Sequence, residues 1–258
     1  MQSANQKEAG AKAPMSDAEK QTRIELAACY RLAAHYKMTD TIYTHISARV
    51  PNEPEHFLIN PYGFMWEEIT ASSLVKIDVD GNKIDASPHR VNPAGFTIHS
   101  AVHMGRHSAA WVMHTHTRSG FAVSCLEEGL LPLSQIALQY YSQVGYHDYE
   151  GIALDLDERG RIVDALGDNV ALILRNHGLL TVGETAGQMF SNMFYLNRAC
   201  EIQESTLSMG RPLKKIDDAI IKRVSEQFGQ MAYDDGDLLL EWDAQVRLAD
   251  RLDQGFRD

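Results

Sequence analysis

Two short apolar runs that end in histidine constrain the fold of this chain more than any other feature. Residues 111–113 (Trp-Val-Met) lead directly into His114-Thr115-His116. Residues 170–174 (Val-Ala-Leu-Ile-Leu) lead into Arg175-Asn176-His177-Gly178 in the same way. Runs of this kind, rich in aliphatic and aromatic residues and bounded by polar residues or glycine, are typical of buried strands. The chain is therefore expected to contain a sheet in which two strand ends carry histidines.

These three histidines form a candidate metal site. Side chains at positions i and i+2 of a strand lie on one face, roughly 6–7 Å apart at the backbone, so His114 and His116 can share one ion. His177 would add a third nitrogen and leave a coordination position open, as in catalytic zinc and related divalent-metal sites. A histidine at a strand end is more often a hydrogen-bonded core or surface residue, so the spacing alone leaves a structural role open.

Composition excludes several other classes of function. The formal charge is −11, from 35 acidic and 24 basic residues, so a basic nucleic-acid-binding face is not expected. No apolar stretch reaches the roughly 18 residues of a membrane-spanning helix. Residues 1–17 are polar and alanine-rich without an apolar signal core, and are predicted to be a disordered tail. An odd set of cysteines in apolar contexts predicts buried, reduced thiols and a cytoplasmic protein: Cys29, Cys125 and Cys200.

Strand and helix patterns alternate along the rest of the chain, which predicts a mixed sheet flanked by helices. Ser16 and Glu19 have the spacing of a capping box at the start of the first helix. We interpret residues 18–210 as one α/β domain and residues 211–258 as a helical C-terminal extension. The predicted strands are 44–50, 56–59 and 74–79, with a loop at 88–95, and the predicted helices are 16–36, 96–104, 120–126, 157–166 and 183–209.

Several motifs, in order, resemble those of the class II aldolase/adducin family, and in particular its adducin-head branch. The resemblance covers roughly residues 22–210. It implies a three-layer α/β/α fold with a largely antiparallel central sheet. Besides the two histidine motifs, the segments that carry it are 56–63, 69–76, 95–101, 146–151, 174–179 and 199–203.

The resemblance also implies a chemistry. Aldolases of this family are metal-dependent lyases, usually with zinc, that act on small molecules and are commonly tetramers with active sites between subunits. The metal ligands of the family fall on His114, His116 and His177 of this sequence. We therefore expect a divalent metal, zinc being favoured over iron or manganese, a small-molecule substrate and a homo-oligomer, with a tetramer favoured. No nucleic-acid or membrane partner is expected.

The sequence departs from the sugar-phosphate aldolases of the family at their other functional positions. Their acid/base glutamate corresponds to Gly95, which cannot transfer a proton. Their Gly-Asn phosphate-binding turn corresponds to Thr44-His45, and their helper tyrosine to Gln135. Loss of a positioned acid or base typically lowers a rate by about 10²–10⁴. The catalytic residues are therefore unknown at this stage, and the usual aldolase mechanism is not expected.

Other residues are weaker candidates. Asn60 and Gly63 lie in a turn that resembles the substrate side of the family's site, although a plain Asn-Pro turn is the simpler interpretation. His99 falls on the helix predicted to face the site, either as a substrate contact or as a buried hydrogen-bonding group. His103 is predicted to be exposed to solvent. Glu184 is predicted to cap the helix that follows it, and the alternative is that it orients a metal ligand.

Three functions remain open. The first is a metal-dependent lyase, either an aldolase with another base or a decarboxylase, in which a divalent cation stabilises the negative charge left on the substrate. The second is an oxygenase whose three histidines hold iron. The third is an adducin-like binding or structural protein without catalysis.

Overall fold

A seven-stranded sheet forms the centre of the protein. The computed structural model describes residues 15–153, 155–231 and 235–258. The strand order is β3-β2-β1-β4-β7-β6-β5, and all neighbouring strands are antiparallel except β5 and β6. The expectation of a largely antiparallel sheet is confirmed. The strands are β1 (His45–Val50), β2 (Glu53–Ile59), β3 (Val75–Asp78), β4 (Trp111–Thr115), β5 (Val144–His147), β6 (Ala171–Leu174) and β7 (Gly178–Gly183).

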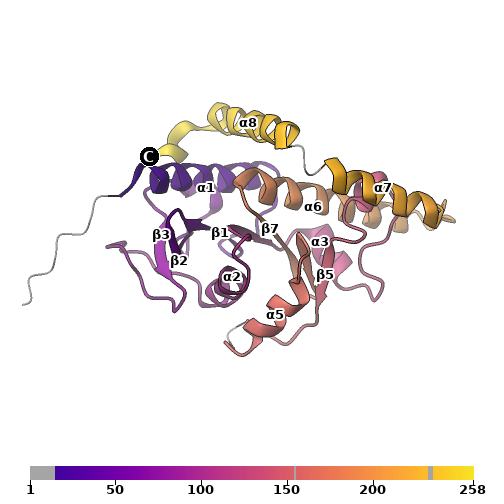
Figure 1. Ribbon diagram of the computed structural model, residues 1–258, viewed down its shortest axis with the longest axis horizontal. Coiled ribbons are helices and arrows are strands. Elements are labelled where there is room, and N and C mark those ends of the chain that lie inside the picture. The colour runs from indigo at the N-terminus through magenta and orange to yellow at the C-terminus, as the bar shows by residue number, and fades with distance from the viewer. Residues whose placement is uncertain (1–14, 154, 232–234) are drawn as a thin grey trace, which may run out of the picture.

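Helices cover both faces of the sheet and give the predicted three layers. Figure 1 shows α1 and α6 above the sheet, α2 and α5 below it, and α8 lying over α1. Among the described residues, no helix combines the length and apolar character needed to cross a membrane. The helices are α1 (Asp17–His35), α2 (Pro93–Gly105), α3 (Arg118–Ser124), α4 (Gln135–Leu138), α5 (Glu158–Leu166), α6 (Ala186–Ser208), α7 (Asp218–Met231) and α8 (Asp235–Leu252), with short 3₁₀ turns at Trp66–Glu68 and Gln254–Arg257.

Alternation along β4 decides on which side of the sheet the first histidine lies. Trp111 and Met113 belong to the hydrophobic core under α1 and α6, and the Thr115 hydroxyl donates to the sulfur of Met193 on α6. Val112 belongs to a second core, which packs against α2 and α5. Because successive side chains point to opposite faces, His114 lies on the α2 side with Val112.

The helix boundaries follow local capping. Ser16 accepts a hydrogen bond from the backbone N–H of Glu19, which is one half of the predicted capping box, and α1 begins at Asp17, the last residue of the predicted tail. The other half is absent, because the Glu19 carboxylate pairs with Arg23 and Lys76. Residues 1–14 of that tail lie outside the described residues. Helix α2 begins at Pro93, three residues before the predicted start, because Asn92 caps it and proline suits a first turn.

The prediction of a helix from residue 183 was wrong at its beginning. Residues Gly178–Gly183 form β7, and α6 starts at Ala186. Thr185 caps this helix by accepting from the backbone N–H of Gln188, so the capping role predicted for Glu184 belongs to its neighbour. The hydroxyl of Thr185 provides the short acceptor that a helix start favours.

The C-terminal residues pack on the side of the sheet away from His114. Helix α8 contacts α1 and α6, where Trp242 lies against Gly187. The backbone N–H of Ser72 donates to the carbonyl of Asp258 at 2.8 Å. The C-terminal helix therefore supports α1 and α6 and does not cover the face of the sheet that carries the histidine.

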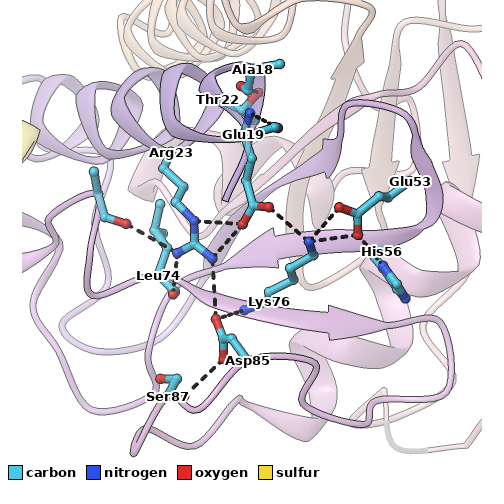
Figure 2. Close-up of polar contacts among 12 residues, drawn as sticks. Ala18, Glu19, Thr22, Arg23, Glu53, His56, Leu74, Lys76, Asp85 and Ser87 are labelled. Carbon is cyan, nitrogen blue, oxygen red and sulfur yellow. Dashed lines mark hydrogen bonds and ion pairs between the residues drawn. The ribbon is translucent and has the colours of Figure 1, made fainter. Parts of the chain in front are cut away.

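A buried ion network ties α1 to the edge strand β3. Figure 2 shows the Glu19 carboxylate between the guanidinium of Arg23 and the ammonium of Lys76. The nitrogen–oxygen distances are 3.0 and 2.9 Å, and all three residues are more than nine-tenths buried. Arg23 also donates to the carbonyl of Leu74, and Lys76 forms a second ion pair with Glu53. Each buried charge thus has several partners, which buried ion pairs require.

Replacement of the central carboxylate should destabilise the fold. Glu19→Ala leaves Arg23 and Lys76 buried with fewer partners, and we expect a loss of about 3–5 kcal/mol in the free energy of unfolding. Lys20→Ala, which removes an exposed ion pair one residue along the same helix, should cost much less. Urea unfolding of the two variants measures the difference. Equal losses would show that the network does not stabilise the fold.

Candidate metal centre

The structure brings His114, His116 and His177 together. His114 is on β4, His116 follows the end of that strand, and His177 lies in the turn between β6 and β7. The ring centroids are 4.8, 4.7 and 4.9 Å apart for the three pairs. One ring nitrogen from each residue lies within 4.8 Å of those of the other two. The predicted grouping of these side chains in space is therefore present.

A close backbone approach places His177 beside the other two. Strand β7 pairs with β4 so that Leu179 lies opposite Thr115. A Cβ atom on Gly178 would lie 2.4 Å from the carbonyl oxygen of Thr115, so only glycine fits here. The preceding Asn176 has a φ of +56°, a left-handed conformation that asparagine tolerates. Asn176 and Gly178 thus turn the chain tightly around the third histidine.

Two of the rings are oriented by acceptors on their outer side. Nδ1 of His114 lies 2.9 Å from the carbonyl oxygen of Leu179, and Nδ1 of His116 lies 2.9 Å from the Asp40 carboxylate. Both oxygens can only accept, so each Nδ1 carries the proton in a neutral ring. The bare Nε2 atoms then face one another at 3.0 Å.

A divalent metal fits this arrangement. Two facing nitrogen lone pairs repel each other unless a cation lies between them. Zinc–nitrogen bonds of 2.0–2.1 Å in a tetrahedral site separate two nitrogens by roughly 3.3–3.4 Å, close to the distance here. A hydrogen bond from the outer nitrogen to a carboxylate or a backbone carbonyl is the usual support of a histidine ligand. Asp40 and Leu179 provide that support.

The protonation state of the rings also suits metal binding. Burial, followed by the neighbouring His177, holds the pKa of His114 well below its usual value of 6.5. Burial and the nearby His116 lower the pKa of His177 to about 4. Both rings are therefore neutral at pH 7, which is the form that binds a metal.

His45 lies next to this cluster. It is directly opposite His114 in the β1–β4 pairing, and the two ring centroids are 5.1 Å apart. A Cβ atom on Gly95 would lie 2.4 Å from Cδ2 of His45 and 2.8 Å from its Nε2. The imidazole of His45 therefore occupies the space where a side chain at position 95 would begin. This is the position that the family resemblance equates with the glutamate of the sugar-phosphate aldolases.

A chain of hydrogen bonds leads from His45 into the layer between β1 and α2. Nδ1 of His45 lies 2.8 Å from Nε2 of His99, and Nδ1 of His99 lies 2.5 Å from the hydroxyl of Ser47. That hydroxyl is 2.7 Å from Nε2 of His103, whose Nδ1 is 3.1 Å from the carbonyl of Ala109. The two histidines of α2 are four residues apart, so both face the same strand.

Two sequence-based interpretations are corrected here. His99, a candidate substrate contact, is fully buried with both ring nitrogens hydrogen-bonded, so neither nitrogen is free for a substrate. The alternative, a buried hydrogen-bonding histidine, describes it. His103, predicted to be exposed, is only 2% exposed, because β1 presents Ser47 to it.

The substrate role of Asn60 and Gly63 stays a prediction. Asn60 is buried after β2, and the Tyr30 hydroxyl donates to its side-chain oxygen at 2.8 Å. The same hydroxyl accepts from the backbone N–H of Ile46, the neighbour of His45. Gly63 is exposed, with a φ of +103° and open space around it. Asn60 is thus connected to β1 through Tyr30.

A hollow of about 490 Å³ lies next to the turn that carries the third histidine, with Asn176 in its lining. Arg175 borders it, donates to the carbonyl of Leu126 and stacks 4.5 Å from the ring centre of Tyr146. Cys125 also borders it and is exposed, so the prediction that it is buried was wrong; Cys29 and Cys200 are buried as predicted. Cys125 is the residue that follows the short helix α3, and it is exposed although the last two helical residues, Val123 and Ser124, are buried. The hollow lies beside the turn of His177 and not against its ring, which borders a much smaller cavity of about 10 Å³.

Comparisons with known proteins identify the family to which this fold belongs. The family model "Class II Aldolase and Adducin N-terminal domain" matches residues 24–204. The protein of Caulobacter vibrioides named "Putative aldolase class 2 protein" is 51% identical over 249 residues, 96% of each chain. Alpha-adducin of Rattus norvegicus is 48% identical over 198 residues, 75% of this chain and 27% of adducin. The structure of L-fuculose 1-phosphate aldolase from Glaciozyma antarctica matches with a TM-score of 0.80 and 25% identity, over 96% of this chain and 97% of that one.

The chain belongs to the class II aldolase/adducin family. The matched residues cover more than two thirds of its length and include all three clustered histidines. The three-layer architecture expected from the resemblance agrees with this membership.

Asp40 should strengthen metal binding through His116. Asp40→Ala removes the carboxylate that orients the ring, and we expect metal affinity to fall about 10- to 100-fold. Competition with a chelator of known affinity measures the change in the dissociation constant. Asp164→Ala, on the exposed side of α5, is the matched control and should bind as the wild type does. Equal affinity in both variants would contradict an orienting role.

Acid should destabilise the metal-free protein through its buried histidines. Burial holds the pKa of His99 well below 6.5 and lowers that of His103 to about 3. The unfolded chain titrates near pH 6.5, so it binds more protons below that pH than the folded protein does. Stability is therefore full above about pH 6.5 and falls with decreasing pH, by about 1.4 kcal/mol per pH unit for each such histidine.

Denaturant unfolding between pH 7.5 and 5 in the presence of a chelator measures this slope. His103→Gln should reduce the slope by the contribution of one histidine, about 1.4 kcal/mol per pH unit. His107→Gln, at an exposed histidine, should leave it unchanged. A wild-type slope in His103→Gln would contradict the assignment of a lowered pKa to His103.

Proposed function

We propose that this protein is a divalent-metal-dependent lyase, aldolase- or decarboxylase-like, that acts on a small hydroxy, oxo or carboxylate substrate. The observation that carries the proposal is the convergence of three imidazoles, two of them with Nε2 atoms 3.0 Å apart. A set of three neutral ligands leaves the full charge of the ion for the substrate. Zinc suits these ligands best, although iron and manganese are compatible with them.

The residues of the chain have defined tasks in such a reaction. His114, His116 and His177 would hold the metal, which supplies Lewis-acid stabilisation of developing negative charge. The Asp40 carboxylate and the Leu179 carbonyl orient two of the ligands. Burial of His114 excludes bulk water from one side of the site and strengthens electrostatic interactions there.

The absence of a glutamate at position 95 narrows the reaction. Gly95 has no group that can take or give a proton, so the lyase would not use a carboxylate base at this position. A decarboxylation needs no such base to start, since loss of carbon dioxide itself generates the carbanion. The aldolase alternative is supported by the similarity to the L-fuculose 1-phosphate aldolase structure.

The second candidate is a non-catalytic binding protein like the adducins. It is favoured by the 48% identity with alpha-adducin, which is higher than the 25% identity with the solved fuculose-phosphate aldolase. The three converging ligands favour the enzyme, because a protein that only binds a partner has no need of an open metal position.

Further properties belong to the same proposal. We infer a homo-oligomer, with a tetramer favoured, a small-molecule substrate, and a cytoplasmic location in keeping with the buried free thiols of Cys29 and Cys200. We assign residues 18–210 to the lyase domain and residues 211–258 to a helical extension.

Removal of a ligand should remove the metal without unfolding the protein. His114→Ala and His177→Ala are each expected to lower bound metal well below one equivalent per chain, because two nitrogens hold the ion much less tightly than three. Elemental analysis of protein purified without a histidine tag measures the content, and circular dichroism monitors the fold. His107→Ala is the control. One equivalent of metal in both ligand variants would contradict the proposal that His114 and His177 bind the metal.

Catalysis separates the two candidates. Metal-loaded protein should cleave or decarboxylate a member of a panel of hydroxy ketones, hydroxy acids and carboxylates, with L-fuculose 1-phosphate as the aldolase probe. Turnover that disappears in His177→Ala would support the lyase. Metal-loaded protein that turns over no member of the panel would favour the adducin-like alternative.

A further inference from the structure

The ring of His45 has one nitrogen that the protein does not use. Its Nδ1 is bonded to His99, but Nε2 has no hydrogen-bond partner among the residues that the structure describes. The side chain is 4% exposed, and its ring lies beside that of His114. Nε2 of His45 is not among the fully buried atoms without a partner, so a molecule that enters beside His114 can reach it and supply the missing hydrogen bond.

The far end of the hydrogen-bond chain determines what kind of partner this must be. The backbone carbonyl of Ala109 can only accept, so Nδ1 of His103 carries the proton and Nε2 of His103 accepts. The Ser47 hydroxyl must then donate its one proton to His103. Having no second proton, the hydroxyl accepts from Nδ1 of His99.

The same logic continues to the near end. Since Nδ1 of His99 donates, its Nε2 accepts, and the donor is Nδ1 of His45. In neutral His45 the proton is therefore on Nδ1, and Nε2 carries a lone pair. The carbonyl of Ala109, four hydrogen bonds away, thus determines which nitrogen of His45 is presented beside the histidine cluster.

We propose that His45 contacts the substrate and accepts a hydrogen bond from it through Nε2. Ser47, His99 and His103 are positioning residues that hold His45 in the tautomer with a proton on Nδ1. The proposal rests on the proposed metal-dependent function, since it assigns the partner of His45 to the substrate of that site.

This assignment names a feature of the substrate. A lone pair attracts a hydroxyl and repels the oxygens of a phosphate or a carboxylate. The part of the substrate that faces β1 is therefore a free hydroxyl group, as in a hydroxy ketone, and the anionic groups of the substrate point elsewhere. Gly95 contributes by leaving the space that the imidazole needs.

The tautomers can be measured directly. Nitrogen-15 NMR of the full, zinc-loaded chain with labelled histidines distinguishes a protonated ring nitrogen from a bare one, and zinc does not broaden the signals. We expect His45, His99 and His103 each to carry the proton on Nδ1. A proton on Nε2 of His45 would overturn the proposal.

A matched pair of serine variants tests the positioning role. Ser47→Ala removes the hydroxyl between the two histidines of α2, and we expect His45 to become a mixture of tautomers with the zinc content unchanged. Ser100→Ala removes another fully buried hydroxyl, which donates to the Phe96 carbonyl and takes no part in the hydrogen bonds between His45 and Ala109. This variant should leave the tautomers unchanged. A wild-type spectrum of His45 in Ser47→Ala would show that the chain does not position it.

A pair of ligands tests the substrate contact. Dihydroxyacetone has one more hydroxyl than hydroxyacetone, and calorimetric titration of the zinc-loaded protein should show about 2- to 10-fold tighter binding of dihydroxyacetone. His45→Phe should abolish this preference. Equal binding of the two ketones by the wild type, or a preference that survives in His45→Phe, would overturn the assignment. Failure to bind zinc would instead contradict the proposed function.

Discussion

The position of β4 between β1 and β7 is the constraint on which the whole site depends. In the observed register His45 lies opposite His114, and Leu179 lies opposite Thr115. A shift of one residue would turn His114 toward α6 and bury Thr115 on the other side. Because β4 is hydrogen-bonded on both edges and packed on both faces, this register is strongly specified. The same pairing brings the turn with His177 against the end of β4.

Two groups of histidines lie on the α2 side of the sheet and differ in the oxygen atoms that they contact. His114 and His116 use an outer carbonyl and a carboxylate, so their inner nitrogens are left for a ligand. His99 and His103 have both nitrogens bonded within the protein. Burial keeps the rings of His114, His99 and His103 neutral, and a neutral ring has one donor and one acceptor. The position of each proton therefore follows from an acceptor oxygen, directly in His103, His114 and His116 and through the Ser47 hydroxyl in His99.

The fold and the site give different kinds of information about function. The sheet and its helices are those of the class II aldolase/adducin family, which includes proteins named as aldolases and proteins named as adducins. Chemistry depends on particular side chains, and these can change while the fold stays the same. At Gly95 the chain has no acid or base, and the imidazole of His45 fills the space instead. The lyase that we propose therefore differs from a sugar-phosphate aldolase in the side chains around its metal ligands.

The sequence by itself predicted that His114 and His116 share one face, because strand periodicity is a local property of the chain. It offered His177 as the third member through a similar strand-end pattern and through the family resemblance. Strand β7 and the roles of His45 and Asp40 were decided only by the tertiary structure. The hydrogen bonds of His45 and His116 reach across 54 and 76 positions of the chain, respectively, and no local pattern signals them. Whether an imidazole is a candidate ligand, a buried acceptor or a solvated side chain depends on which oxygen lies beside it. That neighbour is set by strand register and helix packing.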